Sequence, residues 1–326
     1  MPNDATILGL PPGELLDHYR IDAVIGRGGM SELYRATDTN TGHVVALKVP
    51  LPEIQADPVL FERFKREEEI GQLLDHLGIV KTFNGEGRSR VYMVMEWVEG
   101  RLLRSILDQE KRLSIERSVA ITLRICDALD GMHKHGVVHS DLKPENIMVD
   151  SEDRIKIIDF GIAMKEDARR LTFVNLSATL GTPDYIAPEQ VKGQRGDQRS
   201  DVYAAGIMLY EMLTGRVPFT GPSPLASMNE RLQHDAPPIR ELNPDVSPEL
   251  QEIVYRSLAR EPRHRYASAS EMAWDLEHQE QVGIDSPQAA TAPRVRRKIK
   301  RELMLYISLG LIPIVIFIVM MLVAKK

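Results

Sequence analysis

The chain has 326 residues, of which 43% are hydrophobic and 27% charged, so it is long enough for two lobes or two domains of ordinary globular composition. Its formal net charge of −6 argues against general nucleic-acid binding, which requires a basic face. A single cysteine, Cys126, excludes an internal disulfide framework and suits a reducing compartment. Because it lies in the apolar helical pattern of residues 118–132, we interpret it as a buried, inert thiol.

Residues 19–49 alternate apolar and polar side chains around two turns, which predicts three β-strands. The strands are RIDAVI (20–25), SELYRA (31–36) and HVVALKV (43–49), and the first two are joined by the glycine-rich sequence GRGGMS (26–31). Glycine lets the backbone approach phosphate groups closely and direct N–H groups toward them. The segment lacks the strand-to-helix context of a dinucleotide site, which argues against NAD or FAD.

Lys48 lies on the third strand, where its ammonium group can neutralise the α- and β-phosphates of ATP. A flexible lysine needs an anchor, and a carboxylate on a helix is the natural one. Residues 58–77 predict a helix with apolar residues on or near one face. Glu67 lies on that face, so we select it as the anchor, whereas Glu68 and Glu69 are expected to point toward solvent.

Residues 91–100, VYMVMEWVEG, predict a strand that ends in a glycine turn. In a two-lobed protein this segment would become the hinge, and backbone groups around Glu96 to Val98 could contact the edge of an adenine ring. An ordinary buried strand is equally compatible with the sequence.

The sequence HSDLKPENIMV at 139–149 contains residue types that phosphoryl transfer requires. Asp141 is placed to orient an attacking hydroxyl and accept its proton, Lys143 can hold the γ-phosphoryl group, and Asn146 can bind a metal ion. His139 is interpreted as structural.

A second acidic candidate follows in RIKIIDFG (154–161), which predicts a strand running into a turn. Asp159 in this turn is the expected Mg²⁺ ligand, because magnesium favours carboxylate and phosphate oxygens. Each motif alone is weak, but the ordered set is specific: the glycine-rich loop, Lys48, Glu67, Asp141, Asn146 and Asp159.

Residues 19–278 resemble the Hanks-type (eukaryotic-like) Ser/Thr protein kinases, and GRGGMSELYRA resembles their bacterial members in particular. Further motifs of the family are the APE element at 187–189 and the helix SDVYAAGIMLYEMLTG at 200–215. LKPEN after Asp141, and Thr182 before the APE element, match the Ser/Thr kinases rather than the Tyr kinases.

The resemblance implies an α+β fold with a β-rich N-lobe (19–98) and a mostly helical C-lobe (99–278). It implies transfer of the γ-phosphoryl group of ATP to protein Ser/Thr hydroxyls with Mg²⁺, or with Mn²⁺ in its place, and autophosphorylation. Asp201 would hold the catalytic loop, and Arg265 would pair with Glu189. The residues expected around ATP are Gly26, Arg27, Gly28, Gly29, Met30, Ser31, Leu33, Ala46, Lys48, Glu67, Met95, Glu96 and Val98.

Ser140 departs from the family pattern, in which an arginine commonly precedes the catalytic aspartate and clasps a phosphate on the activation loop. Serine cannot form that bidentate charge pair. We therefore hypothesise that activity depends only weakly on loop phosphorylation, although Thr172, Ser177 and Thr179 are candidate phosphosites in the loop.

Two alternatives remain. Small-molecule phosphotransferases of the same fold carry a small residue at the position of Ser140, but they generally lack the APE element that, with Arg265, is present here. A kinase-like scaffold without catalysis would be favoured by loss of Lys48, Asp141 or Asp159, and all three are present.

Residues 303–324 predict a C-terminal transmembrane helix, because these 22 residues carry no formal charge. At about 1.5 Å per residue they would span roughly 33 Å, enough for a hydrocarbon core of ~30 Å. The preceding linker (279–302) contains the basic run RVRRKIKR (294–301), which the positive-inside rule places on the cytoplasmic side. No signal peptide is visible in the N-terminal extension (1–18).

These observations predict a single-pass protein of a bacterial cell membrane with its kinase domain in the cytoplasm. The expected partners are protein substrates, membrane lipid around the C-terminal helix and, at the level of family resemblance, a phosphatase and a second copy of the chain. Nucleic acid is not expected as a partner.

Overall fold

The computed structural model describes residues 9–84, 87–160, 164–165 and 184–284. The chain divides into two compact units, Met1–Gly283 and Ile284–Lys326, and nearly all described residues belong to the first. No helix in the described ranges is long and apolar enough to cross a membrane, and the predicted span at 303–324 lies outside them. Four residues named above also lie outside the described ranges: Thr172, Ser177, Thr179 and Thr182.

The N-terminal part contains a six-stranded antiparallel sheet in the order β1-β2-β3-β4-β6-β5. Its strands are β1 (Leu15–Leu16), β2 (Tyr19–Arg27), β3 (Ser31–Asp38), β4 (Val44–Pro50), β5 (Thr82–Phe83) and β6 (Met93–Glu96). The three predicted strands are confirmed as β2, β3 and β4. The strand expected over 91–100 is shorter, and β1 lies inside the segment that the sequence set apart as an extension.

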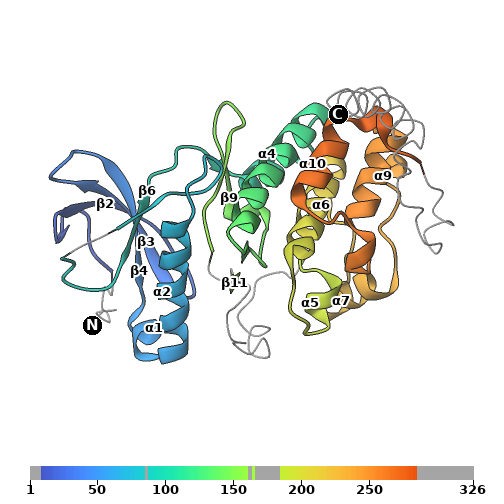
Figure 1. Cartoon of the computed structure of the whole chain (residues 1–326). Coiled ribbons are helices and arrows are strands. Elements are labelled where there is room, and N and C mark those ends of the chain that lie inside the picture. Colours follow the sequence, from blue (N-terminus) through green and yellow to red (C-terminus); the bar gives the residue numbers. More distant parts are fainter. Residues whose placement is uncertain (1–8, 85–86, 161–163, 166–183, 285–326) are drawn as a thin grey trace, which may run out of the picture. The chain divides into compact units, whose positions relative to one another are not determined.

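Alternation along β4 determines where its lysine points. Val45, Leu47 and Val49 face one core cluster, whereas Ala46 faces the larger core. Because side chains alternate between the two faces of a strand, Lys48 shares the face of Ala46. That face is covered by helix α2 (Figure 1).

Two helices follow β4, α1 (Pro52–Ala56) and α2 (Pro58–Leu73). Asp57 caps the start of helix α2, because its carboxylate accepts hydrogen bonds from the first-turn amides of Val59 and Leu60. The helix ends before residue 77, where the prediction placed its end, because the chain becomes extended at Leu74 and then pairs with the C-terminal part. In that pairing, Ile157 N donates to Gly78 O at 2.9 Å.

The C-terminal part is mostly helical, and α4, α6, α9 and α10 pack together (Figure 1). Its helices are α3 (Leu103–Glu110), α4 (Ile115–Lys134), α5 (Pro188–Val191), α6 (Gln198–Thr214), α7 (Pro224–Gln233), α8 (Ile239–Leu242), α9 (Pro248–Ser257), α10 (Ala269–Glu277), and the 3₁₀ turns η1 (Pro144–Asn146), η3 (Pro262–His264) and η4 (Gln279–Gln281). The helix expected at 200–215 is confirmed as α6, and every residue from Ser200 to Leu213 is buried. Gly215 ends it with φ 79°, a conformation that favours glycine.

Two small sheets lie beside these helices. One joins β7 (Arg101–Leu102), β9 (Ile147–Val149) and β10 (Ile155–Ile157), and the other pairs β8 (Val137–Val138) with β11 (Met164–Lys165). The helix predicted over 118–132 lies within α4, where Cys126 is fully buried. Burial raises the pKa of Cys126 to about 12, so this thiol is an inert core residue.

Candidate active site

Three charged side chains from different elements meet between the sheet and the helical part. Lys48 on β4 donates a hydrogen bond from Nζ to Glu67 Oε1 on α2. The same ammonium group lies 3.4 Å from Oδ1 of Asp159, which follows β10. The Glu67 side chain is 5% exposed and that of Asp159 is 44% exposed, so the ion pair is anchored in the interior and open to solvent on one side.

The electrostatics of this trio keep the lysine charged. Burial acts to lower the pKa of Lys48, but the carboxylates of Glu67 and Asp159 outweigh it, so its pKa is raised. Burial also raises the pKa of Glu67, and the neighbouring ammonium group acts against this rise. The charged Lys48 suits a phosphate group, and the partly exposed carboxylate of Asp159 beside it suits a magnesium ion that a nucleotide would carry.

The expectation that Glu68 points toward solvent is wrong. Its side chain is 17% exposed and accepts a hydrogen bond from Arg88 Nη1 at 2.5 Å. Arg88 also donates to the backbone carbonyls of Tyr92 and Phe83, so it links α2 to strand β5 and to the residue before β6. Glu69 is exposed, as predicted.

The glycine-rich segment forms the turn between β2 and β3. Gly28 N donates to Ser31 O at 2.8 Å, which closes this turn. An added Cβ at Gly26 would meet no described atom within 4 Å, so packing within the protein does not require glycine there. Arg27 is exposed and Met30 half-buried, which leaves this segment accessible to a ligand.

Four of the predicted adenine-side residues lie in the same sheet, namely Leu33, Ala46, Met95 and Glu96, whereas Val98 follows β6. Leu33 lies opposite Lys48 in the β3–β4 ladder, and Ala46 lies opposite Met95 in the β4–β6 ladder. Glu96 also bonds to residues outside β4: its N–H donates to Lys81 O at 2.9 Å, and its carboxylate accepts from Lys156 Nζ at 2.5 Å. The N–H and the carboxylate of Glu96 therefore serve contacts within the protein.

A second group of polar residues follows β8. Lys143 Nζ donates to Asp141 Oδ2 at 2.7 Å, so the two residues assigned to the reaction are in direct contact. Asn146 in η1 donates from Nδ2 to the backbone carbonyl of Asp141 at 2.9 Å. This bond directs the amide nitrogen of Asn146 toward the loop and leaves its oxygen as the group that could bind a cation.

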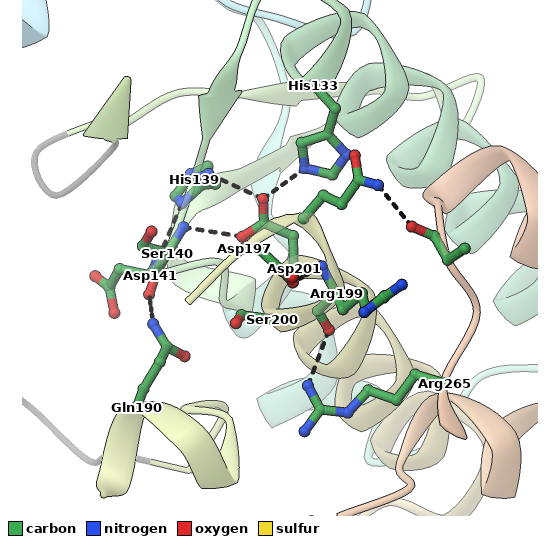
Figure 2. Close-up of polar contacts among 12 residues, drawn as sticks. His133, His139, Ser140, Asp141, Gln190, Asp197, Arg199, Ser200, Asp201 and Arg265 are labelled. Atoms are coloured by element: carbon green, nitrogen blue, oxygen red, sulfur yellow. Dashed lines mark hydrogen bonds and ion pairs between the residues drawn. The ribbon is translucent and has the colours of Figure 1, made fainter. Parts of the chain in front are cut away.

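Asp201 on α6 holds the loop that carries Asp141 (Figure 2). Its Oδ2 accepts from His139 N at 2.9 Å and its Oδ1 from Ser140 N at 2.9 Å. His133 Nε2 on α4 lies 2.7 Å from Asp201 Oδ2 and adds a contact that the sequence did not indicate. His139 is buried with its ring near Phe160, in a structural position.

The structure brings Glu189 and Arg265 together in a bidentate ion pair, in which both hydrogen bonds measure 2.7 Å. The Arg265 side chain is fully buried. Burial acts to raise the pKa of Glu189, but hydrogen bonds from Arg265 outweigh it, so the pKa is lowered. Ser200 Oγ also donates to Glu189 Oε1 at 2.7 Å, which fixes the start of α6 against this pair.

Two residues absent from the predicted set hold the segment around the APE element. Arg231 on α7 is fully buried and donates to the carbonyls of Ile186 at 2.6 Å and Asp184 at 3.2 Å. Gln190 donates from Nε2 to the carbonyl of Ser140 at 2.9 Å. Neither has a recognisable sequence signal, because each acts on backbone groups far away in the chain.

The described residues fit Mg-ATP better than a metal held by protein alone. No group of three or more His, Cys, Asp or Glu side chains in the described part could hold a metal ion. Magnesium bound to a nucleotide commonly uses one or two protein ligands together with phosphate oxygens. Asp159 and Asn146 match that requirement, and Lys48 supplies the charge for the phosphates.

Comparison with known proteins gives consistent matches. The protein kinase domain family matches residues 19–275. A probable serine/threonine-protein kinase of Streptomyces coelicolor is 39% identical over 82% of this chain and 40% of its own length. The serine/threonine-protein kinase PknB of Mycolicibacterium smegmatis is 37% identical over 90% of this chain and 47% of its own length. The chain thus spans about half or less of these curated relatives.

A solved structure supports the fold. The kinase domain of PknI from Mycobacterium tuberculosis superposes with a TM-score of 0.65 and 26% sequence identity. The match covers 83% of this chain and 100% of that one.

Proposed function

Because the chain belongs to the protein kinase family, among the bacterial serine/threonine kinases, we propose that it transfers the γ-phosphoryl group of ATP to Ser and Thr hydroxyls of proteins. The single observation that carries this proposal is the convergence of Lys48, Glu67 and Asp159 in one group, with Asp141 and Lys143 in contact on the neighbouring loop. A scaffold has no need for this set of charges.

The role proposed for each site residue follows from its position. Lys48, held by Glu67, would bind the α- and β-phosphates, and the glycine-rich turn would cover them with backbone N–H groups. Asp141 would orient the substrate hydroxyl and take its proton, while Lys143 stabilises charge on the γ-phosphoryl group. Asp159 and Asn146 would hold magnesium, which when bound neutralises the charge of the β- and γ-phosphates.

Replacement of Lys48 with Met tests the nucleotide site. Without the ammonium group, transfer to a generic protein substrate should fall by about 10²–10³-fold, the scale of losing one preorganised charge contact. Isothermal titration with Mg-ATP should show weaker binding in the same variant. Unchanged transfer by Lys48→Met would contradict the proposed site.

We further propose that residues 303–324 anchor the protein in a membrane with the kinase domain in the cytoplasm. The uncharged length of the segment and the basic run before it support this proposal. The full chain should then sediment with membranes and resist alkaline extraction, and deletion of 303–326 should release it. Recovery of the full chain in the alkaline supernatant would contradict the anchor.

We propose also that autophosphorylation occurs, and that Ser140 makes activity only weakly dependent on it. A phosphatase that removes these phosphates and a homodimer are family-level expectations. The triple variant Thr172→Ala, Ser177→Ala, Thr179→Ala should keep most of the substrate phosphorylation, because serine lacks the charge to clasp a phosphate. A loss of more than about a hundredfold, or ~2.7 kcal/mol, would contradict weak dependence.

A further inference from the structure

Gln190 connects the segment after the APE element to the catalytic loop (Figure 2). Its Oε1 accepts from the N–H of Ala187 at 2.9 Å, and its Nε2 donates to the carbonyl of Ser140 at 2.9 Å. One partner is a donor and the other an acceptor, so only one orientation of the amide satisfies both. The side chain is 7% exposed, which shields both bonds from competition with water.

The residue that Gln190 holds has an unusual backbone. Ser140 has φ 68°, in the left-handed region that non-glycine residues rarely occupy without support. Asp201 Oδ1 accepts from the N–H of Ser140, and Gln190 donates to its carbonyl. The Ser140 hydroxyl is buried and has no hydrogen-bond partner among the described residues, so these two backbone bonds are its polar attachments there.

Fixing this carbonyl determines the direction of the next residue. The Ser140 carbonyl belongs to the peptide plane that leads into Asp141, so its orientation sets where the Asp141 backbone begins. Asp201 holds the peptide plane on the other side of Ser140. The conformation before Asp141 is therefore constrained at both of its peptide bonds.

We propose that Gln190 is a positioning residue for Asp141. With Asp201, it clamps Ser140 in the left-handed conformation and so aims the Asp141 carboxylate at the substrate hydroxyl; this inference rests on the proposed kinase function. The clamp contains no phosphate group. It orders the residue before Asp141 by a route that does not require an arginine at position 140 or a phosphate on the activation loop.

Gln190→Glu tests the clamp with almost no change in shape. The variant keeps an acceptor for Ala187 N but places an oxygen against the Ser140 carbonyl, where the amide nitrogen had donated. We expect kcat to fall by about tenfold, the scale of one lost hydrogen bond, with KM for ATP unchanged because the nucleotide contacts lie elsewhere. Gln194→Glu, the same change at an exposed side chain four residues later, is the matched control and should leave kcat unaltered.

A second substitution that restores kcat distinguishes a loss of Asp141 positioning from general damage to the fold. Glycine occupies the left-handed region without a Cβ penalty, so Gln190→Glu with Ser140→Gly should regain part of the lost kcat. If Gln190→Glu does not fold, Gln190→Met, which removes both bonds but keeps a similar volume, tests the same expectation. A kcat equal to that of the unmutated protein in a folded Gln190 variant, or no rescue by glycine, would overturn the clamp. Absence of transfer by the unmutated chain would instead reject the proposed function.

Discussion

At the scale of single residues, the C-terminal part depends on carboxylates that are buried and fully paired. Glu189 illustrates the balance, since desolvation disfavours its charge and the two hydrogen bonds from Arg265 restore it. Removing one member of a buried ion pair leaves an unpaired charge, which typically costs about 3–5 kcal/mol. Replacing Glu189 or Arg265, even with a residue of similar shape, should therefore destabilise the segment around the APE element.

Glu189→Gln should destabilise the kinase domain in a pH-dependent manner. The pKa of Glu189 is lowered from its ordinary value of 4.5, so its contribution to stability is present above that value and is lost as pH falls through the folded-state pKa. The difference in unfolding free energy between the unmutated protein and Glu189→Gln should thus be constant near neutral pH and shrink below pH 4.5. Denaturant titrations at several pH values measure this difference.

The exposed Glu277→Gln on α10 is the matched control, because the same chemical change there removes no buried pair. A stability difference for Glu189→Gln that stays constant down to pH 3, or one that grows on acidification, would contradict the assigned role of the pair.

At the scale of elements, helix α2 is attached at three points, two on the sheet and one on the segment before β6. Glu67 reaches Lys48 on β4, and Glu68 reaches Arg88 in the segment before β6. Gly71 packs so closely on β5 that a Cβ there would lie 2.2 Å from Thr82 Oγ1. Adjacent residues of a helix project about 100° apart, so the two glutamates together resist rotation of α2 about its axis.

Arg88→Met should therefore lower the catalytic efficiency with ATP, although Arg88 is not among the predicted ATP contacts. Without its partner, Glu68 would no longer hold α2, and Glu67 would hold Lys48 less firmly. We expect kcat/KM for ATP to fall by about tenfold. Arg88→Lys, which keeps a positive charge and N–H donors for Glu68, should lose less activity than Arg88→Met.

Glu69→Gln is the control for this helix, because Glu69 is exposed on the next position of α2. Equal ATP kinetics in Arg88→Met and the unmutated protein would show that the Glu68–Arg88 contact does not position the helix.

At the scale of the whole molecule, the sequence predicts the parts of the site that lie in short motifs. Lys48, Asp141 and Asp159 could be selected because their roles follow from neighbouring residues in fixed order. The three strands around the glycine-rich turn and the helix containing Cys126 are confirmed for a similar reason, since their periodicity is local. Helix α6 is expected from the family resemblance, because a helix buried on every side has no apolar face to reveal it. Element ends were less predictable because tertiary contacts determine them.

The supporting contacts could not be predicted in this way. Arg88 acts on a residue 20 positions away, Gln190 on one 50 positions away, and Arg231 on one 45 positions away. Each looks like an ordinary polar residue until the fold brings its partner close. The error about Glu68 has the same origin, because a helical face that looks solvent-facing in sequence is covered by the segment before β6.

The most direct measurement compares the unmutated chain with its Asp141→Asn variant, each incubated with Mg-ATP and a generic protein substrate, with phosphates mapped by mass spectrometry. The proposed function predicts incorporation on Ser and Thr by the unmutated chain. In the variant, the loss of the proton acceptor should reduce it by about 10²–10⁴-fold while ATP binding persists. Equal incorporation by both proteins, or none by the unmutated chain, would contradict the assignment of a working Ser/Thr kinase centred on Asp141.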